Sequence, residues 1–548
     1  MKKLALILLI VCLLPLAGLA EGQPWRGDKS NMPITPEKTE LTVWITVPAD
    51  VEDMNTNYMT QWYEDMTNIH VNWITATTSD SAQLLTLSLT SGEYPDIYMT
   101  GLSVDQIVTY GMGEGVLIPL EDLIEQYAPN MRQVFEIAPE VKELITAPDG
   151  HIYTFYRKDD MRTQIPFAKL WMNLPWLAQY TEATGKGMPE TLDEFRDVLV
   201  YFRDHDMNGN GYATDEIPLL GTFSWDHQGS DPLYWIMNCF TYFPMELTYV
   251  KDGKAAFAPQ GEDYREGLKY VRQLVVDGLL DELTYTQDLN QYRAVVNATS
   301  ADSMVVGVAA APYYMRFVTD SVYYGDAASD FFVIPPVSGP TGLRQTPSQS
   351  TGGMNNWAIT KACKDPVAAI KWIDYLTCRE IALWTNYGDE GTDWEATGEY
   401  DEVNGPTFRR LVKNALYKNN TGASSQNLRW SGWLSKIFLP GIYTTWTEEM
   451  EEGTLAANQV KAGEIYRQYA VEDGRPATIW CTDEDLILEQ SELNTQISDY
   501  AANMWTQFIL GTLDINDDAQ WAAYEQGLKD NGLDRFLEVL NEYWGLND

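Results

Sequence analysis

The chain has 548 residues, of which 37 are Lys or Arg and 79 are Asp or Glu, so its formal net charge at pH 7 is −42. This charge argues against binding to nucleic acid or to an anionic membrane face, because both depend on basic patches. The length exceeds that of one ordinary hydrophobic core, so we expect two or three lobes.

Residues 1–20 predict a secretory signal. Two lysines precede an apolar run over 4–16, and small residues up to Ala20 follow it. The run is too short to favour a helix that spans a membrane. Cys12 lies inside the run rather than after a cleavage site, so we expect no lipid anchor. The mature chain should therefore be secreted or held at the extracellular cell surface.

The first part of the mature chain predicts an α/β lobe with a largely parallel sheet. Residues 21–37 are polar and rich in proline, and they predict a flexible leader. Apolar runs then alternate with helical patterns, which is typical of strand–helix–strand units. We expect strands over 41–47, 70–75, 96–99 and 151–156, and helices over 57–67, 81–91 and 120–127.

The middle of the chain predicts more helix. Thr191, with Glu194 three residues later, should begin a helix with a capping box. From about residue 405 we expect a mostly helical region rich in Trp and Tyr. The expected helices cover 171–182, 191–205, 264–277, 287–296 and 366–376, and the expected strands cover 304–311, 331–334 and 357–360.

The segment 204–218 predicts a calcium site. Ca²⁺ takes about six to eight oxygen ligands, and short Asp and Asn side chains at alternate positions supply them from one turn. Glycines at 209 and 211 let the backbone curl around an ion. Nothing nearby resembles a nucleophile or a base, so the expected role is structural. The candidate ligands are Asp206, Asn208, Asn210, Tyr212, Asp215 and Glu216.

The loop can be framed in two ways. A frame that starts at Asp204 matches the EF-hand spacing, with Asp215 in place of the bidentate Glu. A frame that starts at Asp206 gives Asp-x-Asn-x-Asn-Gly and a closing Asp-Glu pair, and we prefer it. The alternative to both is a plain Asn-Gly turn between a helix and a strand.

Cysteine and histidine usage argues against transition-metal chemistry. Cys239, Cys363, Cys378 and Cys481 are too widely spaced for a zinc site or a disulfide framework, although a Cys363–Cys378 bridge stays open. The chain has four histidines, and none lies in a metal-binding spacing. The 19 Trp and 32 Tyr are more informative, because such rings stack on sugar faces as well as fill cores.

Several stretches taken together resemble the extracellular solute-binding proteins of ABC importers, family 1. The resemblance is closest to the branch that contains alginate-oligosaccharide binders and Gram-positive sugar-binding lipoproteins, and it covers most of the chain. Met188-Pro-Glu-Thr-Leu-Asp-Glu-Phe195 runs into the glycine-rich loop, as in that family. The other matching stretches are 91–97, 110–120, 128–130, 147–153, 215–218 and 387–394.

The sequence departs from this family pattern at two points. Thr214 is an extra residue before Asp215, which leaves open which of residues 214–216 contact an ion. The family's lipid-attachment cysteine is also missing from the signal region.

The resemblance implies a type II periplasmic-binding-protein-like α/β fold, with two lobes, an interlobe cleft and a helix-rich C-terminal region. It implies lobe one over 38–155 and 352–404, and lobe two over 156–351 and 405–548. Such proteins bind a solute, close around it by a hinge motion and present it to permease subunits without chemistry on the ligand. We expect a monomer that binds no nucleic acid.

Ligand-binding residues are expected where strands end at the cleft. Tyr153 and Tyr156 lie by the first crossing between lobes, and Tyr313 and Tyr314 follow a buried strand. Glu390 and Trp394 resemble the acid and ring of the oligosaccharide binders. Trp44 and Trp357 are weaker candidates. For each residue the alternative is ordinary packing in a core or between lobes.

The ligand is therefore expected to be a carbohydrate, and an oligosaccharide above all, with a peptide or another small solute still open. One alternative function is a secreted carbohydrate-binding surface protein without a transporter. Another is a glycoside hydrolase, which needs two carboxylates across the scissile bond. No serine-hydrolase elbow and no phosphate-binding loop occurs in the sequence.

Overall fold

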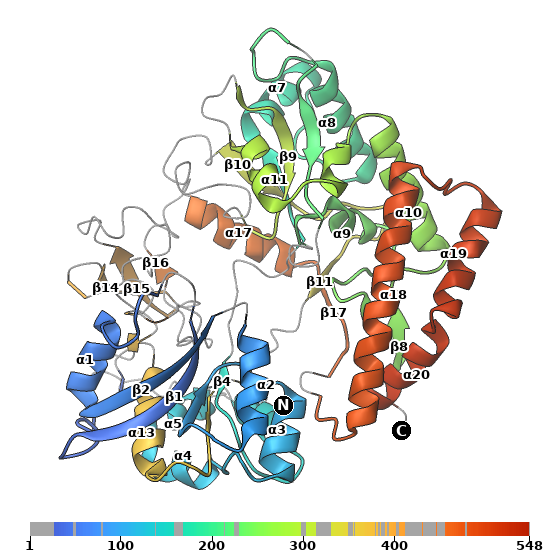
Figure 1. Cartoon of the computed structure of the whole chain (residues 1–548). Coiled ribbons are helices and arrows are strands. Elements are labelled where there is room, and N and C mark those ends of the chain that lie inside the picture. Colours follow the sequence, from blue (N-terminus) through green and yellow to red (C-terminus); the bar gives the residue numbers. More distant parts are fainter. Residues whose placement is uncertain are drawn as a thin grey trace, which may run out of the picture.

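Figure 1 shows two α/β bodies, with long C-terminal helices along one side of the second body. The N-terminal body carries β1, β2 and β4, and the other carries β9 and β10. The computed structural model describes residues 27–47, 51–77, 80–137, 139–157, 168–212, 214–223, 229–297, 303–313, 330–348, 354–355, 357–378, 380–381, 384, 390–391, 394–401, 405–410, 430, 445–446, 455–476 and 479–546.

The first body is built on a four-stranded sheet in the order β13-β3-β1-β2. β1 pairs in parallel with β2 and β3, whereas β13 pairs antiparallel with β3. Val43 and Ile45 face one hydrophobic cluster and Trp44 faces another, as the alternation of a strand requires. The strands are β1 (Thr39–Val47), β2 (Ile69–Thr77), β3 (Ile97–Met99) and β13 (Ala358–Ile359).

Helices cover both faces of this sheet. A buried carboxylate holds two of them together, because Asp374 of α13 accepts hydrogen bonds from the Asn130 and Met131 amides, at 3.2 and 2.8 Å, where α5 begins. The helices are α1 (Tyr58–Thr67), α2 (Ser81–Ser91), α3 (Val104–Ile107), the π-helical η1 (Val108–Gly113), α4 (Glu121–Tyr127), α5 (Pro129–Ile137), α6 (Pro139–Ile145) and α13 (Pro366–Leu376).

The second body contains a mixed sheet in the order β10-β5-β9-β6, in which β5 is antiparallel to both neighbours. Its strands are β5 (Leu170–Asn173), β6 (Ile217–Leu220), β9 (Val306–Ala310) and β10 (Phe331–Ile334), and the hairpin β7 (Thr248–Lys251)–β8 (Lys254–Phe257) lies apart from the sheet. Its helices are α7 (Leu174–Thr184), α8 (Leu192–Asp204), α9 (Pro232–Met237), α10 (Glu262–Val276), the 3-10 helix η3 (Glu282–Tyr285) and α11 (Leu289–Val296).

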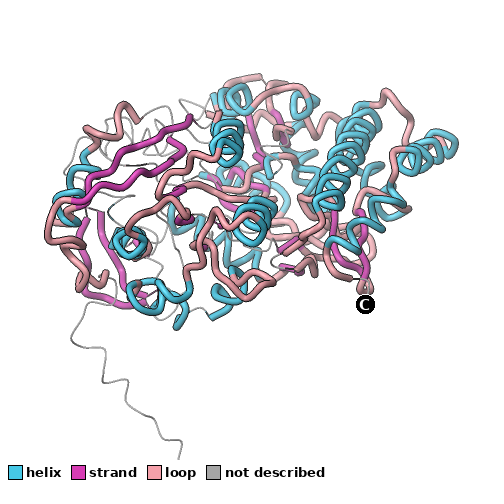
Figure 2. Tube along the Cα trace, turned by 60° about the horizontal axis from the view of Figure 1, so that its bottom comes forward, coloured by secondary structure: helices cyan, strands magenta, loops and turns pink. Residues whose placement is uncertain are grey.

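The C-terminal helices share the hydrophobic core of the second body. Trp505 packs edge-on against Phe223, with ring centroids 5.8 Å apart, and belongs to the same cluster as the strands of the mixed sheet. The C-terminal helices are α17 (Leu455–Arg467), α18 (Glu484–Leu510), α19 (Asp518–Asp530) and α20 (Leu533–Tyr543). In Figure 1, α18, α19 and α20 stand together and α17 lies apart from them. Figure 2 shows long helices near the C-terminus, at the opposite end of the molecule from the long strands.

Short strands connect segments that are distant in sequence. β4 (Tyr156–Arg157) pairs antiparallel with β12 (Met354–Asn355), and β11 (Thr346–Ser348) pairs in parallel with β17 (Ala470–Glu472). A separate small sheet contains β14 (Trp394–Asp401), β15 (Gly405–Arg410) and β16 (Thr445–Trp446). The pairing of β4 with β12 joins the segment where the chain leaves the first body to the segment where it returns.

The predicted fold class is confirmed, and so are most of the expected elements of the first body. The described part of the leader lies against this body: Lys29 Nζ is 2.9 Å from a Glu380 carboxylate oxygen, and the Ile34 amide donates to the Thr67 carbonyl at 2.9 Å. No described helix is long and apolar enough to cross a membrane. Residues 1–26, including the expected signal, lie outside the described part.

Two expected elements were wrong, one in the first part of the chain and one in the middle. The strand over 151–156 is reduced to β4, because residues 152–155 are buried without forming a ladder. The helix over 171–182 begins only at Leu174, since residues 170–173 form the apolar strand β5 and Asn173 then caps α7. A fully apolar strand has no alternation by which to distinguish it from a helix.

Three further expectations need correction. Thr191 does cap α8, but the Glu194 carboxylate accepts from the Glu190 amide rather than completing a capping box. The region after 405 begins with β15, and β16 follows before the helices. The Cys363–Cys378 bridge does not form, since all four described cysteines are free thiols.

Candidate functional site

Tyr153 is packed in a cluster beside the first crossing. It is 4% exposed, and its hydroxyl donates to Asp149 Oδ2 at 2.6 Å. Gly111 lies against the ring: a Cβ there would be 2.9 Å from the Tyr153 Cγ. Burial, and then Asp149, raise the pKa of Tyr153, so the hydroxyl stays a donor. In this structure the ring is a packing element.

Trp357 and Tyr156 lie where two crossings meet. Tyr156 of β4 pairs with Asn355 of β12, and the Phe155 amide donates to the Trp357 carbonyl at 3.0 Å. Trp357 is 3% exposed, and its indole nitrogen makes no hydrogen bond to any described group. A buried donor without a partner costs free energy unless water or a ligand satisfies it. This nitrogen is therefore a buried donor that no described group satisfies.

Trp44 lies on the central strand of the first sheet. Its ring is 6.3 Å from that of Tyr98, and it shares a cluster with Tyr153 and Ala358. It is 2% exposed. The structure thus brings two of the predicted residues, Trp44 and Tyr153, into one cluster, while Trp357 belongs to the cluster on the other face of the sheet.

Tyr313 follows the buried strand β9 and is half-buried, and Tyr314 lies outside the described residues. Two side chains of the β5 region hold the backbone just before Tyr313. Lys169 Nζ donates to the Pro312 carbonyl at 3.0 Å, and Trp171 Nε1 donates to the Ala311 carbonyl at 2.9 Å. Burial lowers the pKa of Lys169 well below its usual value.

The role of Lys169 was not found from the sequence. The residue lies in a run of apolar residues before β5. This pattern gives no sign that its ammonium group reaches the Pro312 carbonyl, just after β9. Buried lysines are rare unless a partner satisfies them. A lysine inside an apolar run is therefore the one feature of the sequence that could have pointed to this role.

Glu390 and Trp394 lie on the small sheet region and face different surroundings. Glu390 is exposed. Trp394 is 1% exposed and packs edge-on against Phe408, with ring centroids 5.4 Å apart. The Gly391 amide donates to the Trp394 carbonyl at 2.6 Å. The Trp394 ring is thus a core residue here.

The glycine-rich loop is ordered by its own side chains. The Asp206 carboxylate accepts from the Gly209, Asn210 and Gly211 amides, at 2.8, 3.1 and 2.9 Å. Asn210 Nδ2 donates to Asp215 Oδ2 at 2.7 Å. Both glycines have positive φ, 74° and 89°, which an L side chain rarely adopts. This curled backbone is what an ion-binding loop requires.

Two carboxylate oxygens of the loop are buried without a hydrogen bond to any described group. They are Asp215 Oδ1 and Glu216 Oε2. Glu216 is 8% exposed; burial and neighbouring Asp215 raise its pKa above the usual value. Residues 206–216 contain no Lys or Arg, so no positively charged side chain of the loop can pair with these two oxygens. The donor set therefore fits a hard cation.

Other observations limit the ligand set. Tyr212 is 70% exposed, so only its backbone carbonyl could face the loop interior. Asp204 is paired with Arg203, whose Nε lies 2.8 Å from Oδ1, which favours the frame that starts at Asp206. Among the described residues, no three His, Cys, Asp or Glu side chains are arranged as a metal-binding group. The amide oxygens of Asn208 and Asn210 would have to complete the shell.

The comparisons with known proteins cover nearly the whole chain. Residues 48–380 match the family described as bacterial extracellular solute-binding protein. The fructooligosaccharide ABC transporter substrate-binding protein FusA of Streptococcus pneumoniae is 27% identical over 543 residues, which cover 96% of this chain and 93% of FusA.

Solved structures of similar proteins share the fold. FusA in complex with kestose is 25% identical with a TM-score of 0.69, and covers 92% of this chain and 99% of its own. An EF-hand mutant of FusA with fructo-nystose has the same TM-score and coverage at 24% identity. An HMO-binding ABC-transporter-associated solute-binding protein of Bifidobacterium longum infantis has a TM-score of 0.73 at 18% identity, with coverages of 93% and 99%.

Proposed function

Because the chain belongs to the bacterial extracellular solute-binding protein family, we propose that it captures a neutral oligosaccharide in its interlobe cleft for an ABC importer. The observation that carries this proposal is the end-to-end match to FusA, which covers both lobes rather than one shared domain. A fructooligosaccharide is the first ligand class to test. The net charge of −42 disfavours anionic sugars.

We assign the ligand contacts to the predicted aromatic residues and Glu390. We assign lobe one to 38–155 and 352–404, and lobe two to 156–351 and 405–548. Two observations support the assignment of the ligand contacts. The buried indole nitrogen of Trp357 has no hydrogen-bond partner among the described groups, and Lys169 fixes the backbone just before Tyr313. Trp430 is an exception to the division, because it packs in the cluster of the first body and donates to Thr60 Oγ1 at 2.7 Å. Trp44, Tyr153 and Trp394 would have to contribute through packing or after a change of conformation.

The proposed role involves no chemistry on the ligand. The protein would be exported by its signal, act outside the cell as a monomer, and hand the sugar to permease subunits. A secreted carbohydrate-binding surface protein without a transporter is the second candidate. Release of sugar from a polysaccharide would instead indicate the glycoside hydrolase.

We assign a structural Ca²⁺ to the loop, held by Asp206, Asn208, Asn210, Asp215 and Glu216 with the Tyr212 carbonyl. When bound, the ion would supply the positive charge that Asp215 Oδ1 and Glu216 Oε2 lack. The EF-hand of the similar protein FusA supports the same assignment. The loop connects α8 to β6, so its order stabilises the second sheet.

Thermal unfolding against a panel of neutral and acidic oligosaccharides tests the ligand class. A ligand that binds only the native state at about 100 times its Kd stabilises the protein by about 2.7 kcal/mol. We expect a neutral oligosaccharide to raise Tm with no product formed. The carbohydrate assignment is wrong if no sugar changes Tm and a peptide library does.

A further inference from the structure

A cavity of about 590 Å³ lies between the C-terminal helices and the segment that follows β17. Its walls come from the residues before and within β7, from Arg475 and Ile479, and from α18 and α20. None of the eight residues predicted to bind the ligand lines it. The volume falls within the usual range for ligand pockets, about 300–1,000 Å³. This pocket, called the helical pocket below, is separate from the proposed cleft contacts.

One wall of the helical pocket is a row of polar side chains on α18. Gln490, Asn494 and Ser498 follow one another at intervals of four residues, which places them on the same face of the helix. Neither amide makes a hydrogen bond with any described group. A row of amides at this spacing offers both donors and acceptors to a ligand with many hydroxyls.

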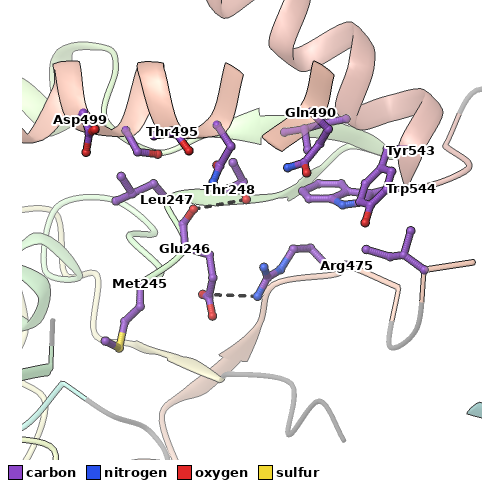
Figure 3. Close-up of a pocket in the computed structure, with 14 residues that line it drawn as sticks. Met245, Glu246, Leu247, Thr248, Arg475, Gln490, Thr495, Asp499, Tyr543 and Trp544 are labelled. Carbon is purple, nitrogen blue, oxygen red and sulfur yellow. Dashed lines mark hydrogen bonds and ion pairs between the residues drawn. The ribbon is translucent and has the colours of Figure 1, made fainter. Parts of the chain in front are cut away.

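The end of the helical pocket is aromatic. Tyr543 and Trp544 lie at the C-terminus of α20, and Figure 3 shows Gln490 pointing toward their rings. A smaller cavity of about 310 Å³ continues from here and shares Ile479 and both rings. Flat rings beside amides match the two faces of a sugar, which is apolar on its C–H side and polar at its edges.

The charges of the helical pocket select against anions. The guanidinium of Arg475 is held by Asp473 at 2.6 Å and Glu246 at 3.3 Å, as the dashed line in Figure 3 marks for Glu246. Asp499 adds a further carboxylate to the lining. Carboxylates thus outnumber the cation, so a phosphate or carboxylate ligand would meet net repulsion.

We propose that the helical pocket is a second binding site for a neutral saccharide, with Gln490 and Asn494 bonding its hydroxyls beside the Tyr543 and Trp544 rings. The adjoining cavity gives room for more than one sugar ring. The site lies next to β17, which pairs with β11 between the two bodies. A sugar bound there would contact Arg475, which follows β17 in the chain.

Isothermal titration of the full-length mature protein with kestose, maltotriose and raffinose tests the site. We expect two saccharides per chain for at least one probe, and one per chain after the double substitution Gln490→Ala and Asn494→Ala. Both residues lie on the helix surface, where alanine favours the helix. Glu492→Gln is the matched control, because Glu492 is exposed on the same helix and does not line the pocket. It should leave both sites intact.

The outcomes separate this site from the proposed cleft. If the double variant loses a site that Tyr313→Ala retains, this supports the helical pocket, whether or not the cleft binds. A single site that Tyr313→Ala abolishes and the double variant leaves unchanged overturns the helical pocket and keeps the cleft. No binding of any probe overturns both.

Discussion

Buried ionisable side chains hold the backbone together at several points of this protein. Asp374 caps the start of α5, Asp231 caps α9, and Lys169 holds the Pro312 carbonyl. Burial raises the pKa of Asp374 to about 6 and that of Asp231 to about 7. At each position the hydrogen bonds to backbone groups offset part of the cost of desolvation.

Asp231→Asn should change how stability depends on pH. The pKa of Asp231 is about 7 in the folded protein and about 3.9 in an unfolded chain, so the folded state binds the extra proton between these values. Stability from this group is therefore complete below about pH 4 and is lost as pH rises to about 7. Asparagine caps a helix equally well, so the variant should gain at most about 4 kcal/mol above pH 7.

The measurement is Tm across this pH range for both proteins. We expect the variant to be more stable at pH 8 and equal to the parent near pH 4. Asp365→Asn is the control: Asp365 also caps a helix that begins with proline, but it is exposed. Parallel pH profiles for Asp231→Asn and the parent would contradict the assignment.

Lys169→Met should weaken oligosaccharide binding more than it weakens the fold. Methionine fills similar space without the ammonium group, whose burial lowers its pKa. Losing the bond to the Pro312 carbonyl frees the backbone before Tyr313, and a loss of about 1.4 kcal/mol is a tenfold rise in Kd. Calorimetry and Tm measure the two effects. Lys461→Met, on the surface of α17, is the control, and an unchanged Kd in Lys169→Met would refute the role.

Among the elements, the strands and helices of the first body were predictable from local sequence. Each strand is an apolar run bounded by polar or turn residues, and each helix has apolar residues at helical spacing. β5 was not, since Leu170, Trp171 and Met172 are all buried and show no alternation. The segment 151–155 reads as a strand but is held by side-chain packing. The small sheet of β14 to β16 depends on pairings between distant residues, which local patterns do not contain.

The loop between α8 and β6 carries the metal prediction. We expect EDTA to lower Tm and added Ca²⁺ to restore it, because the ion satisfies Asp215 Oδ1 and Glu216 Oε2. Asp215→Asn should remove the response, since it takes away one charged ligand. Tm with and without EDTA measures this for the parent and the variants.

Asp204→Asn distinguishes the two frames of the loop. The Asp204 carboxylate is paired with Arg203, so we expect this variant to keep the full response to Ca²⁺. A lost response in Asp204→Asn as well as in Asp215→Asn would support the frame that starts at Asp204. No response to EDTA in the parent would leave the loop as a plain turn.

At the scale of the whole molecule, composition and motif order were enough to predict the family and the two-lobed fold. Most of the site was not predictable at the level of single residues. Trp44, Tyr153 and Trp394 were predicted to contact the ligand, yet in this structure their rings are buried in cores. Rings that stack on sugars and rings that fill cores have the same sequence signature, and only packing separates them.

The proposed function requires that this protein binds a neutral oligosaccharide and leaves it unchanged. Equilibrium dialysis against kestose and other neutral oligosaccharides, followed by chromatography of the recovered sugar, tests it most directly. We predict saturable binding of at least one sugar, recovered intact after release. Failure of every sugar to bind, or recovery of shorter products, would contradict the claim.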